Sequence, residues 1–199
     1  MTNIRAFIAI DLSAQARTQL AELQDDLKAV VPRQTVRWTA PDNIHLTLHF
    51  LGNLSPQEIT NISAVIDEAA SNQPGFSLTL ARLGCFPNSS RPRILWVGIL
   101  GDTNALATLQ GDLGERLRGA INFTPDSRSY SPHLTIGRVR NGVPSRHVKQ
   151  LSQIIQAEQP RVGHLTTLDV TEISLMESNL KPSGVVYTQL KRSQLRSNS

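Results

Sequence analysis

His45-Leu46-Thr47-Leu48 returns 88 positions later as His133-Leu134-Thr135-Ile136. In both segments polar and apolar residues alternate, which indicates a half-buried β-strand, because successive side chains of a strand point to opposite faces. Each strand is therefore predicted to bury its apolar face under helices and to present one histidine and one threonine on the other face. If the two strands face each other, two histidines and two threonines line one cleft.

Equal spacings extend the match beyond these two strands. Ile8 and Trp96 each lie 37 residues before the histidine of their half, and Phe76 and His164 each lie 31 residues after it. Each half therefore predicts the order strand, helix, histidine strand, helix, strand. A repeat of this kind predicts two similar lobes related by an approximate twofold axis, each a sheet with helices on its outer side.

The predicted fold class is α+β, in a single bilobal domain over residues 1–199 whose tail, from about 192 to 199, is frayed. Two antiparallel-rich sheets are expected to face a central cleft, with helices on the outer sides. Capping residues that mark helix starts are Ser13, Ser55 before Pro56, Asp102 or Thr103, and Ser145. Strands are expected at residues 6–11, 44–51, 76–83, 94–100, 132–139, 164–175 and 185–190, with a turn-rich loop at residues 84–92.

The composition is that of a globular protein, with 39% apolar and 18% charged residues. No apolar run approaches the ~20 residues of a membrane span, and the run at residues 7–10 is too short for the apolar core of a signal peptide. Cys85 is the only cysteine, which excludes an intrachain disulfide. A cytoplasmic protein with no membrane partner is expected.

The formal net charge of +4 is unevenly distributed. No acidic residue lies between Asp126 and Glu158, a stretch that holds five basic residues: Arg128, Arg138, Arg140, Arg146 and Lys149. A stretch of one sign attracts a polyanion. A solvated basic face explains the same pattern equally well.

Paired histidines suit the opening of a cyclic phosphate. The reaction needs a base that deprotonates water and an acid that protonates the leaving ribose oxygen, and imidazole does both near neutral pH because its pKa is about 6.5. In-line displacement needs the two groups on opposite sides of phosphorus, which two symmetric lobes provide. The hydroxyls of Thr47 and Thr135 can donate hydrogen bonds to the non-bridging oxygens, where charge accumulates.

The other three histidines are predicted to lie outside the acid–base pair. His164 begins a third His-x-Thr match but has no counterpart in the first half, so it is interpreted as structural. Simple alternation puts His49 on the same face as His45. It could line the cleft there, but a structural position in the sheet is favoured. His147 is expected on the surface.

A metal hydrolase with His45 and His49 as ligands is a rival hypothesis. A pair of ligands four residues apart suits a helix, whereas this segment predicts a strand. No Asp or Glu lies close in sequence to complete a metal site, so no metal is expected.

Longer segments around the two motifs carry a resemblance to a known family. They are residues 5–11, 36–38, 43–48, 50–52, 84–87, 91–97 and 132–138, with Glu177-Ser178, Gly184 and Tyr187 near the end. The chain resembles the two-histidine (2H) phosphoesterase superfamily and, within it, the bacterial and archaeal RNA 2′,3′-cyclic phosphodiesterases, once named 2′-5′ RNA ligases. The resemblance covers nearly the whole chain.

The resemblance implies a bilobal α+β fold with its site between the lobes. It also implies hydrolysis of RNA 2′,3′-cyclic phosphate ends to 2′-phosphate ends, without a metal or other cofactor. His45 is then the proton donor to the leaving O3′, and His133 is the proton acceptor that activates water. The basic surroundings of His133 agree with this assignment, because nearby positive charge lowers a histidine pKa and favours the neutral form.

Two further residues are expected at the site. The family often has a basic residue where Arg138 stands, as a phosphate contact. Simple alternation puts Arg138 on the face of Leu134, away from His133, unless Gly137 hosts a bulge. Phe86 is the preferred candidate for stacking on a base. Trp38 and Trp96 are further candidates for this stacking, although core packing is favoured for Trp96.

Two alternative functions remain open on the sequence alone. One is a non-catalytic RNA-binding module, which fits the basic second half but does not explain two matched histidines. The other is reversible 2′-5′ ligation of RNA ends in the same site. The expected partner is RNA with 2′,3′-cyclic phosphate ends, and the protein is expected to be a monomer.

Overall fold

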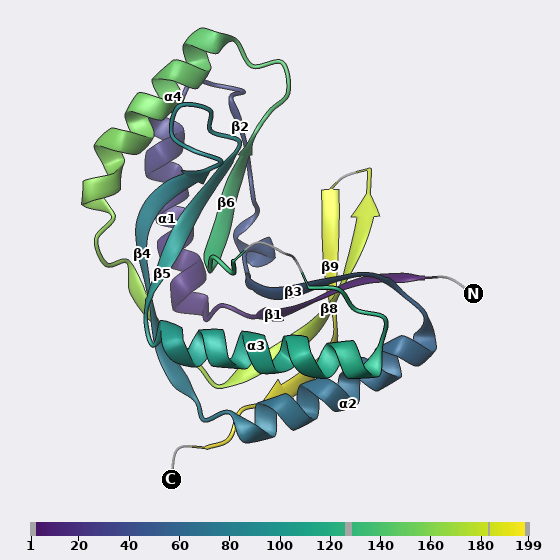
Figure 1. Cartoon of the computed structure of the whole chain (residues 1–199). Coiled ribbons are helices and arrows are strands. Elements are labelled where there is room, and N and C mark those ends of the chain that lie inside the picture. The colour runs from purple at the N-terminus through teal and green to yellow at the C-terminus, as the bar shows by residue number, and fades with distance from the viewer. Residues whose placement is uncertain (1–2, 126–128, 183, 198–199) are drawn as a thin grey trace.

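The structure, a computed structural model, describes residues 3–125, 129–182 and 184–197 (Figure 1). Its strands are β1 (Ile4–Ile10), β2 (Val36–Trp38), β3 (Leu46–Leu54), β4 (Phe76–Phe86), β5 (Ile94–Gly101), β6 (His133–Val139), β7 (Thr166–Val170), β8 (Glu172–Lys181) and β9 (Gly184–Gln194). Its helices are α1 (Ala14–Val30), α2 (Pro56–Asn72), α3 (Thr103–Ala120) and α4 (Ser145–Glu158), with the short 3-10 turns η1 (Pro41–Asn43) and η2 (Gln159–Arg161).

The strands pair antiparallel in the order β7-β4-β5-β6-β3-β1-β8-β9, with β2 added to β6. The two middle strands, β3 and β6, meet at a single residue pair, Leu46 and Leu134. The named strands therefore form two parts of one sheet, and these parts pair with each other at the histidine strands. We call them the His45 lobe (β1, β3, β8 and β9) and the His133 lobe (β2, β4, β5, β6 and β7).

Each lobe has a pair of helices on its outer side (Figure 1). α2 and α3 pack together and cover the His45 lobe, whereas α1 and α4 cover the His133 lobe. The predicted α+β class, antiparallel pairing and bilobal arrangement are thus confirmed.

The two halves of the sequence do not, however, correspond to the two lobes. α1 follows β1 but packs against β7 of the His133 lobe, and α3 follows β5 but packs on the His45 lobe. β4 ends the first half yet pairs with β5 and β7, while β8 pairs with β1 and β9 pairs with β8. The two lobes therefore exchange elements between the halves of the sequence.

Local signals explain where most helices begin. The Ser13 hydroxyl accepts a hydrogen bond from the amide of Ala16 at 3.2 Å and caps α1. Ser55 and Glu58 form a reciprocal capping box at the start of α2, which satisfies two backbone N–H groups that would otherwise lack partners. Asp102 precedes α3 without capping it, because its carboxylate accepts a hydrogen bond from the Ser77 amide instead. α4 starts one residue before the prediction, so Pro144 and not Ser145 is its N-cap.

Three other sequence predictions differ from the structure. The strand expected at 164–175 is divided into β7 and β8, and the loop expected at 84–92 begins only after Phe86. The tail is not frayed in its described part: β9 continues to Gln194, and Leu195 is buried, with its amide donating to the Thr171 carbonyl. Residues 198–199 lie outside the described residues. No described helix combines the length and apolar character needed to cross a membrane.

Candidate active site

Both histidine strands contain a β-bulge at the residue that follows His-x-Thr. On β3, Ala9 faces Thr47 and Ile8 faces His49, so Leu48 is the extra residue. On β6, Trp96 faces Thr135 and Leu95 faces Gly137, so Ile136 is the extra residue. A bulge reverses the alternation of side chains beyond it. The duplicated motif therefore includes a duplicated bulge.

The bulges change the face assignments that simple alternation predicts. His49 turns into the core beneath α3, and the residue after it, Phe50, is 72% exposed. At the equivalent place on β6, Gly137 is buried and Arg138 is exposed. Arg138 therefore shares the face of His133, as the bulge hypothesis for this segment required, and the prediction that His49 shares the face of His45 is wrong.

The contact between the lobes brings the two motifs together. Because β3 and β6 are antiparallel at Leu46 and Leu134, the flanking positions oppose each other as His45 with Thr135 and as Thr47 with His133. Leu46 and Leu134 are fully buried, whereas the four flanking side chains are half-buried on the other side. We call this side the histidine face. On it, each histidine lies beside the threonine of the other lobe.

His45 lies in an aromatic setting. Its ring stacks on Phe7 with 4.5 Å between ring centroids, and the edge of Tyr187 meets it at 5.0 Å. Burial lowers the pKa of His45 from the usual 6.5 to about 4, while a hydrogen bond with the Asn43 backbone and the negative charge of Asp11 act to raise it. The ring is therefore neutral at pH 7 in the free protein.

His133 is oriented by its own backbone. Its Nδ1 lies 2.8 Å from the Ser131 carbonyl oxygen, which can only accept, so Nδ1 carries a proton and Nε2 is left for other partners. The ring meets Phe86 edge-on, with 4.9 Å between centroids. This arrangement holds the tautomer whose free nitrogen can accept a proton.

Tyr130 connects the two lobes beside the site. It precedes β6 in the chain, and its hydroxyl donates a hydrogen bond to the Thr47 carbonyl on β3 at 3.0 Å. Burial raises the pKa of Tyr130 far above its usual value, so the hydroxyl keeps its proton and remains a donor. Tyr130 therefore fixes the backbone of one motif to the segment that leads into the other.

Arg138 supplies positive charge near Tyr187. Burial raises the pKa of Tyr187, and the positive charges of Arg138 and Arg5 act to lower it, which places both guanidinium groups near the Tyr187 hydroxyl. Tyr187 in turn touches the His45 ring. Although Arg138 belongs to the His133 lobe, its charge thus acts across the boundary between the lobes.

The remaining histidines lie elsewhere. Nε2 of His49 is 2.7 Å from the Gln110 carbonyl on α3, and its ring packs against Phe123. His164 is exposed beside β7, which two strands separate from β6. His147 is half-buried on α4. His49 therefore occupies a structural position, as favoured, and none of the three joins the histidine face.

Phe86 is the last residue of β4 and contacts both His133 and, at 5.3 Å, Trp96. Trp96 is opposite Thr135 and covers the backbone of Gly84, where an added Cβ would come within 2.3 Å of the indole ring. Its role is thus packing at the base of the histidine face. Trp38 is half-buried on β2, against Gly137.

Sequence reasoning missed four residues of the site: Phe7, Tyr187, Tyr130 and Phe50. Phe7, Phe50 and Tyr187 belong to segments that carry the family resemblance, which was the available signal. Phe50 is 72% exposed and lies 6.2 Å from Phe7, and its position follows from the bulge. Among the described residues, no three His, Cys, Asp or Glu side chains gather as a metal site would require.

Two of the similar proteins carry the same name. RNA 2′,3′-cyclic phosphodiesterase of Methanothermobacter thermautotrophicus is 31% identical over 94% of this chain and 97% of its own length. The protein of the same name in Escherichia coli is 30% identical over 94% of this chain and 94% of its own. Their lengths correspond closely to that of this chain.

Solved structures share the fold throughout the chain. TT0787 of Thermus thermophilus has a TM-score of 0.77 at 26% identity, covering 98% of this chain and 100% of its own. E. coli LigT complexed with 3′-AMP has a TM-score of 0.74 at 28% identity, covering 97% and 98%. Usb1 of Kluyveromyces marxianus, at 13% identity and a TM-score of 0.56, shares the fold alone.

The family model described as LigT like Phosphoesterase matches the chain twice, at residues 10–96 and 100–187. The first match contains the His45 motif and the second contains the His133 motif. The duplication that the spacing of the sequence indicates is therefore also a duplication of the family pattern, and the chain belongs to the LigT like Phosphoesterase family.

Proposed function

We propose that this protein hydrolyses the 2′,3′-cyclic phosphate ends of RNA to 2′-phosphate ends, without a metal. The observation that carries the proposal is the crossing of β3 and β6, which puts two histidines and two threonines on one face. Two imidazoles beside two hydroxyl donors are what a cyclic phosphodiester needs for acid–base catalysis. The names of the relatives agree with this chemistry.

The reaction is an in-line displacement at phosphorus. Nε2 of His133 accepts a proton from water as the water oxygen bonds to phosphorus. The P–O3′ bond breaks, and His45 gives a proton to O3′. The products are a 2′-phosphate monoester and a free 3′-hydroxyl group. The hydrogen bond between Nδ1 of His133 and the Ser131 carbonyl supports this role, because in the neutral ring it puts the proton on Nδ1 and makes Nε2 the acceptor.

The assignment of His45 as donor requires that it gains a proton before the chemical step. In the free protein its pKa is about 4, so the neutral form dominates at pH 7. A cyclic phosphate carries one negative charge, and a bound anion beside an imidazole raises the imidazole pKa. We infer that His45 takes up a proton from solvent when the anionic substrate binds, so that it is protonated before the P–O3′ bond breaks.

Thr47, Thr135 and Arg138 are the proposed phosphate contacts. The two threonines flank the histidines on the histidine face, and Arg138 brings a guanidinium to the same side. Hydroxyl and guanidinium donors stabilise the charge that builds on the non-bridging oxygens. Phe86, which touches His133, is the proposed stacking surface for a base.

One chain supplies the whole constellation, which supports a protein that works as a monomer. The family relation supports RNA with cyclic phosphate ends as its partner, with no membrane involved. Its single cysteine supports a cytoplasmic location, where thiols stay reduced.

The test is incubation with an oligonucleotide that ends in a 2′,3′-cyclic phosphate, in excess EDTA, with the product ends mapped by ³¹P NMR. The proposal predicts turnover to a 2′-phosphate end. A 3′-phosphate product would contradict the in-line geometry. Activity that EDTA abolishes and a divalent ion restores would point to a metal hydrolase instead.

A further inference from the structure

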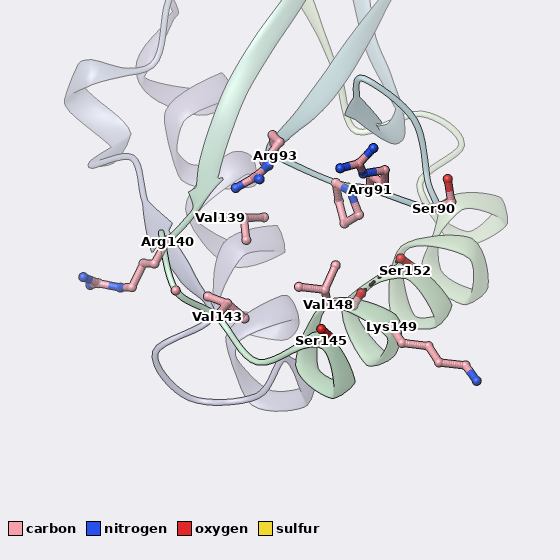
Figure 2. Close-up of a pocket in the computed structure, with 12 residues that line it drawn as sticks. Ser90, Arg91, Arg93, Val139, Arg140, Val143, Ser145, Val148, Lys149 and Ser152 are labelled. Carbon is pink, nitrogen blue, oxygen red and sulfur yellow. Dashed lines mark hydrogen bonds between the residues drawn. The ribbon is translucent and has the colours of Figure 1, made fainter.

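A basic pocket lies at the end of β6 that is away from His133. Its volume is about 550 Å³, and it lies between the loop that joins β4 to β5 and the first turns of α4 (Figure 2). Four cationic residues line it: Arg91, Arg93, Arg140 and Lys149. Neither His45 nor His133 lines this pocket, so it is separate from the histidine face.

The cationic side chains of the pocket have no acidic partner within the described part of the chain. None of its lining residues is acidic, and across residues 3–125, 129–182 and 184–197 none of its four cations forms an ion pair. The first turn of α4 also lacks acidic residues, and Ser145 adds a hydroxyl group to the wall, whereas the Ser152 hydroxyl donates to the Val148 carbonyl. Unpaired cations with nearby hydroxyl donors favour an anionic ligand.

The pocket is rigidly built on its strand side. The Arg93 amide donates to the Phe86 carbonyl at 2.7 Å, and the Arg93 carbonyl accepts from Val139 at 2.9 Å. The Arg140 amide donates to the Thr35 carbonyl at 2.9 Å. In Figure 2, Arg91 and Arg93 lie on the strand side of the pocket, opposite Val148 of α4, while Arg140 and Lys149 extend outward on either side of it.

A second feature connects the pocket with the histidine face. Arg37 on β2 and Arg138 on β6 are directly opposite each other, and both are exposed. Like charges opposite each other destabilise a sheet, and in the part of the chain that the structure describes neither arginine has an ion-pair partner. This pair therefore costs stability in the free protein, and an anion that bridges the two arginines would offset the cost.

The length of β6 sets the size of the ligand. From His133 to Arg140 there are seven residue steps, or about 23 Å of strand. On this path the arginine pair comes first and the pocket second. A ligand that spans the histidines, the arginine pair and the pocket would therefore carry several negative charges along one extended chain. Grooves for single-stranded nucleic acid hold about 4–16 nucleotides, and this path fits the lower end of that range.

We propose that the basic pocket binds the phosphodiester backbone of single-stranded RNA, a few nucleotides on the 5′ side of the cyclic phosphate. The proposal rests on the proposed function, since it takes the cyclic end to lie at the two histidines. It makes short oligonucleotides, and not cyclic mononucleotides, the preferred substrates. The pocket would contact backbone phosphates and not bases, so it would increase affinity without a base preference.

The experiment compares uridine 2′,3′-cyclic phosphate with oligouridylates of increasing length that end in the same group. For the wild-type protein, kcat/KM is expected to rise with length up to about four or five nucleotides. In the double variant Arg93→Gln/Lys149→Gln the rise is expected to shrink by at least about tenfold, because charge-assisted contacts are lost. Turnover of the cyclic mononucleotide stays within twofold. The control is Arg146→Gln, which removes an exposed charge from the same helix outside the pocket.

Binding, measured separately, keeps the two proposals distinguishable. A fluorescein-labelled eight-nucleotide RNA with a 2′-phosphate end should bind the double variant more weakly, with a smaller dependence on salt concentration. If the wild-type protein turned over none of the substrates but still bound the RNA more tightly than the double variant, the proposed function would be rejected and the proposed RNA-binding role of the pocket would stand. Length-independent kcat/KM, or equal losses on mononucleotide and oligonucleotide, would overturn the pocket proposal. The pocket proposal would also be overturned if the double variant bound the labelled RNA as tightly as the wild-type protein does, even if the wild-type pocket bound inorganic phosphate.

Discussion

At the scale of single residues, the protonation state of His45 is the most informative property of the site. Burial beside Phe7 and Tyr187 lowers its pKa to about 4, yet the proposed role needs a protonated ring. A donor that is neutral until an anion binds has a useful consequence, because the site holds no uncompensated buried charge while it is empty. The same pKa makes the assignment testable in the absence of catalysis.

We expect the imidazole of His45 to titrate near pH 4 in the free protein and at least about one unit higher when uridine 2′-phosphate is bound. Histidine-selective ¹⁵N NMR measures both midpoints, with His45→Gln used to assign the signal. A midpoint near 6.5 in the free protein, or no change on adding the nucleotide, would contradict this account of the donor.

The roles of the two histidines separate on a substrate whose leaving group needs no proton. A p-nitrophenyl phosphate ester at the 2′ position of a 3′-deoxynucleoside is such a substrate, because p-nitrophenolate leaves as an anion. Its turnover should be largely retained in His45→Ala and should remain low in His133→Ala, which lacks the base. The opposite ranking would exchange the two roles.

At the scale of elements, the two bulges explain which side-chain faces are predicted correctly by simple alternation along a strand and which are not. The strand pattern predicts that His45 and Thr47 share a face, as do His133 and Thr135, because those residues precede the bulges. Beyond the bulges, alternation fails at His49, and the face of Arg138 depends on whether a bulge is present. A bulge depends on the pairing register with the neighbouring strand, which one strand's own sequence does not specify.

The bulge on β3 turns His49 into the core, where its ring contacts α3. Its Nε2–H donates to the Gln110 carbonyl and joins β3 to α3, and burial lowers its pKa. Because the folded-state pKa is depressed, its contribution to stability is fully present above about pH 6.5 and is lost as the pH falls through the folded-state value. The neutral ring is therefore part of the core.

We expect His49→Ala to lower the free energy of unfolding by about 2–4 kcal/mol at pH 7, from the cavity and the lost hydrogen bond to Gln110. The decrease in stability between pH 7 and pH 5 should also be smaller in this variant than in the wild-type protein. Urea denaturation at the two pH values measures both effects. His164→Ala, at an exposed position, is the control and should stay within about 0.5 kcal/mol. Equal losses in the two variants would contradict the structural role of His49.

At the scale of the whole molecule, the repeat in the sequence predicts two lobes and their relation but not the exchange of elements between them. The offset shared by Ile8 and Trp96 identifies equivalent strands. It carries no information on which sheet a helix covers, and α1 and α3 each cover the sheet of the other half. The exchange makes the lobes mutually dependent for their helices, so the crossing of β3 and β6 is held from both sides.

The central claim is that His45 and His133 act as one acid–base pair, and three alanine variants test it most directly. The measurement is kcat/KM on an oligonucleotide with a 2′,3′-cyclic phosphate end for His45→Ala, His133→Ala and His164→Ala. The account predicts losses of about 10²–10⁴-fold for the first two, the usual contribution of a positioned acid or base, and a value within several-fold of wild type for the third. Equal losses at all three positions, or near-normal turnover without His45 or His133, would contradict it.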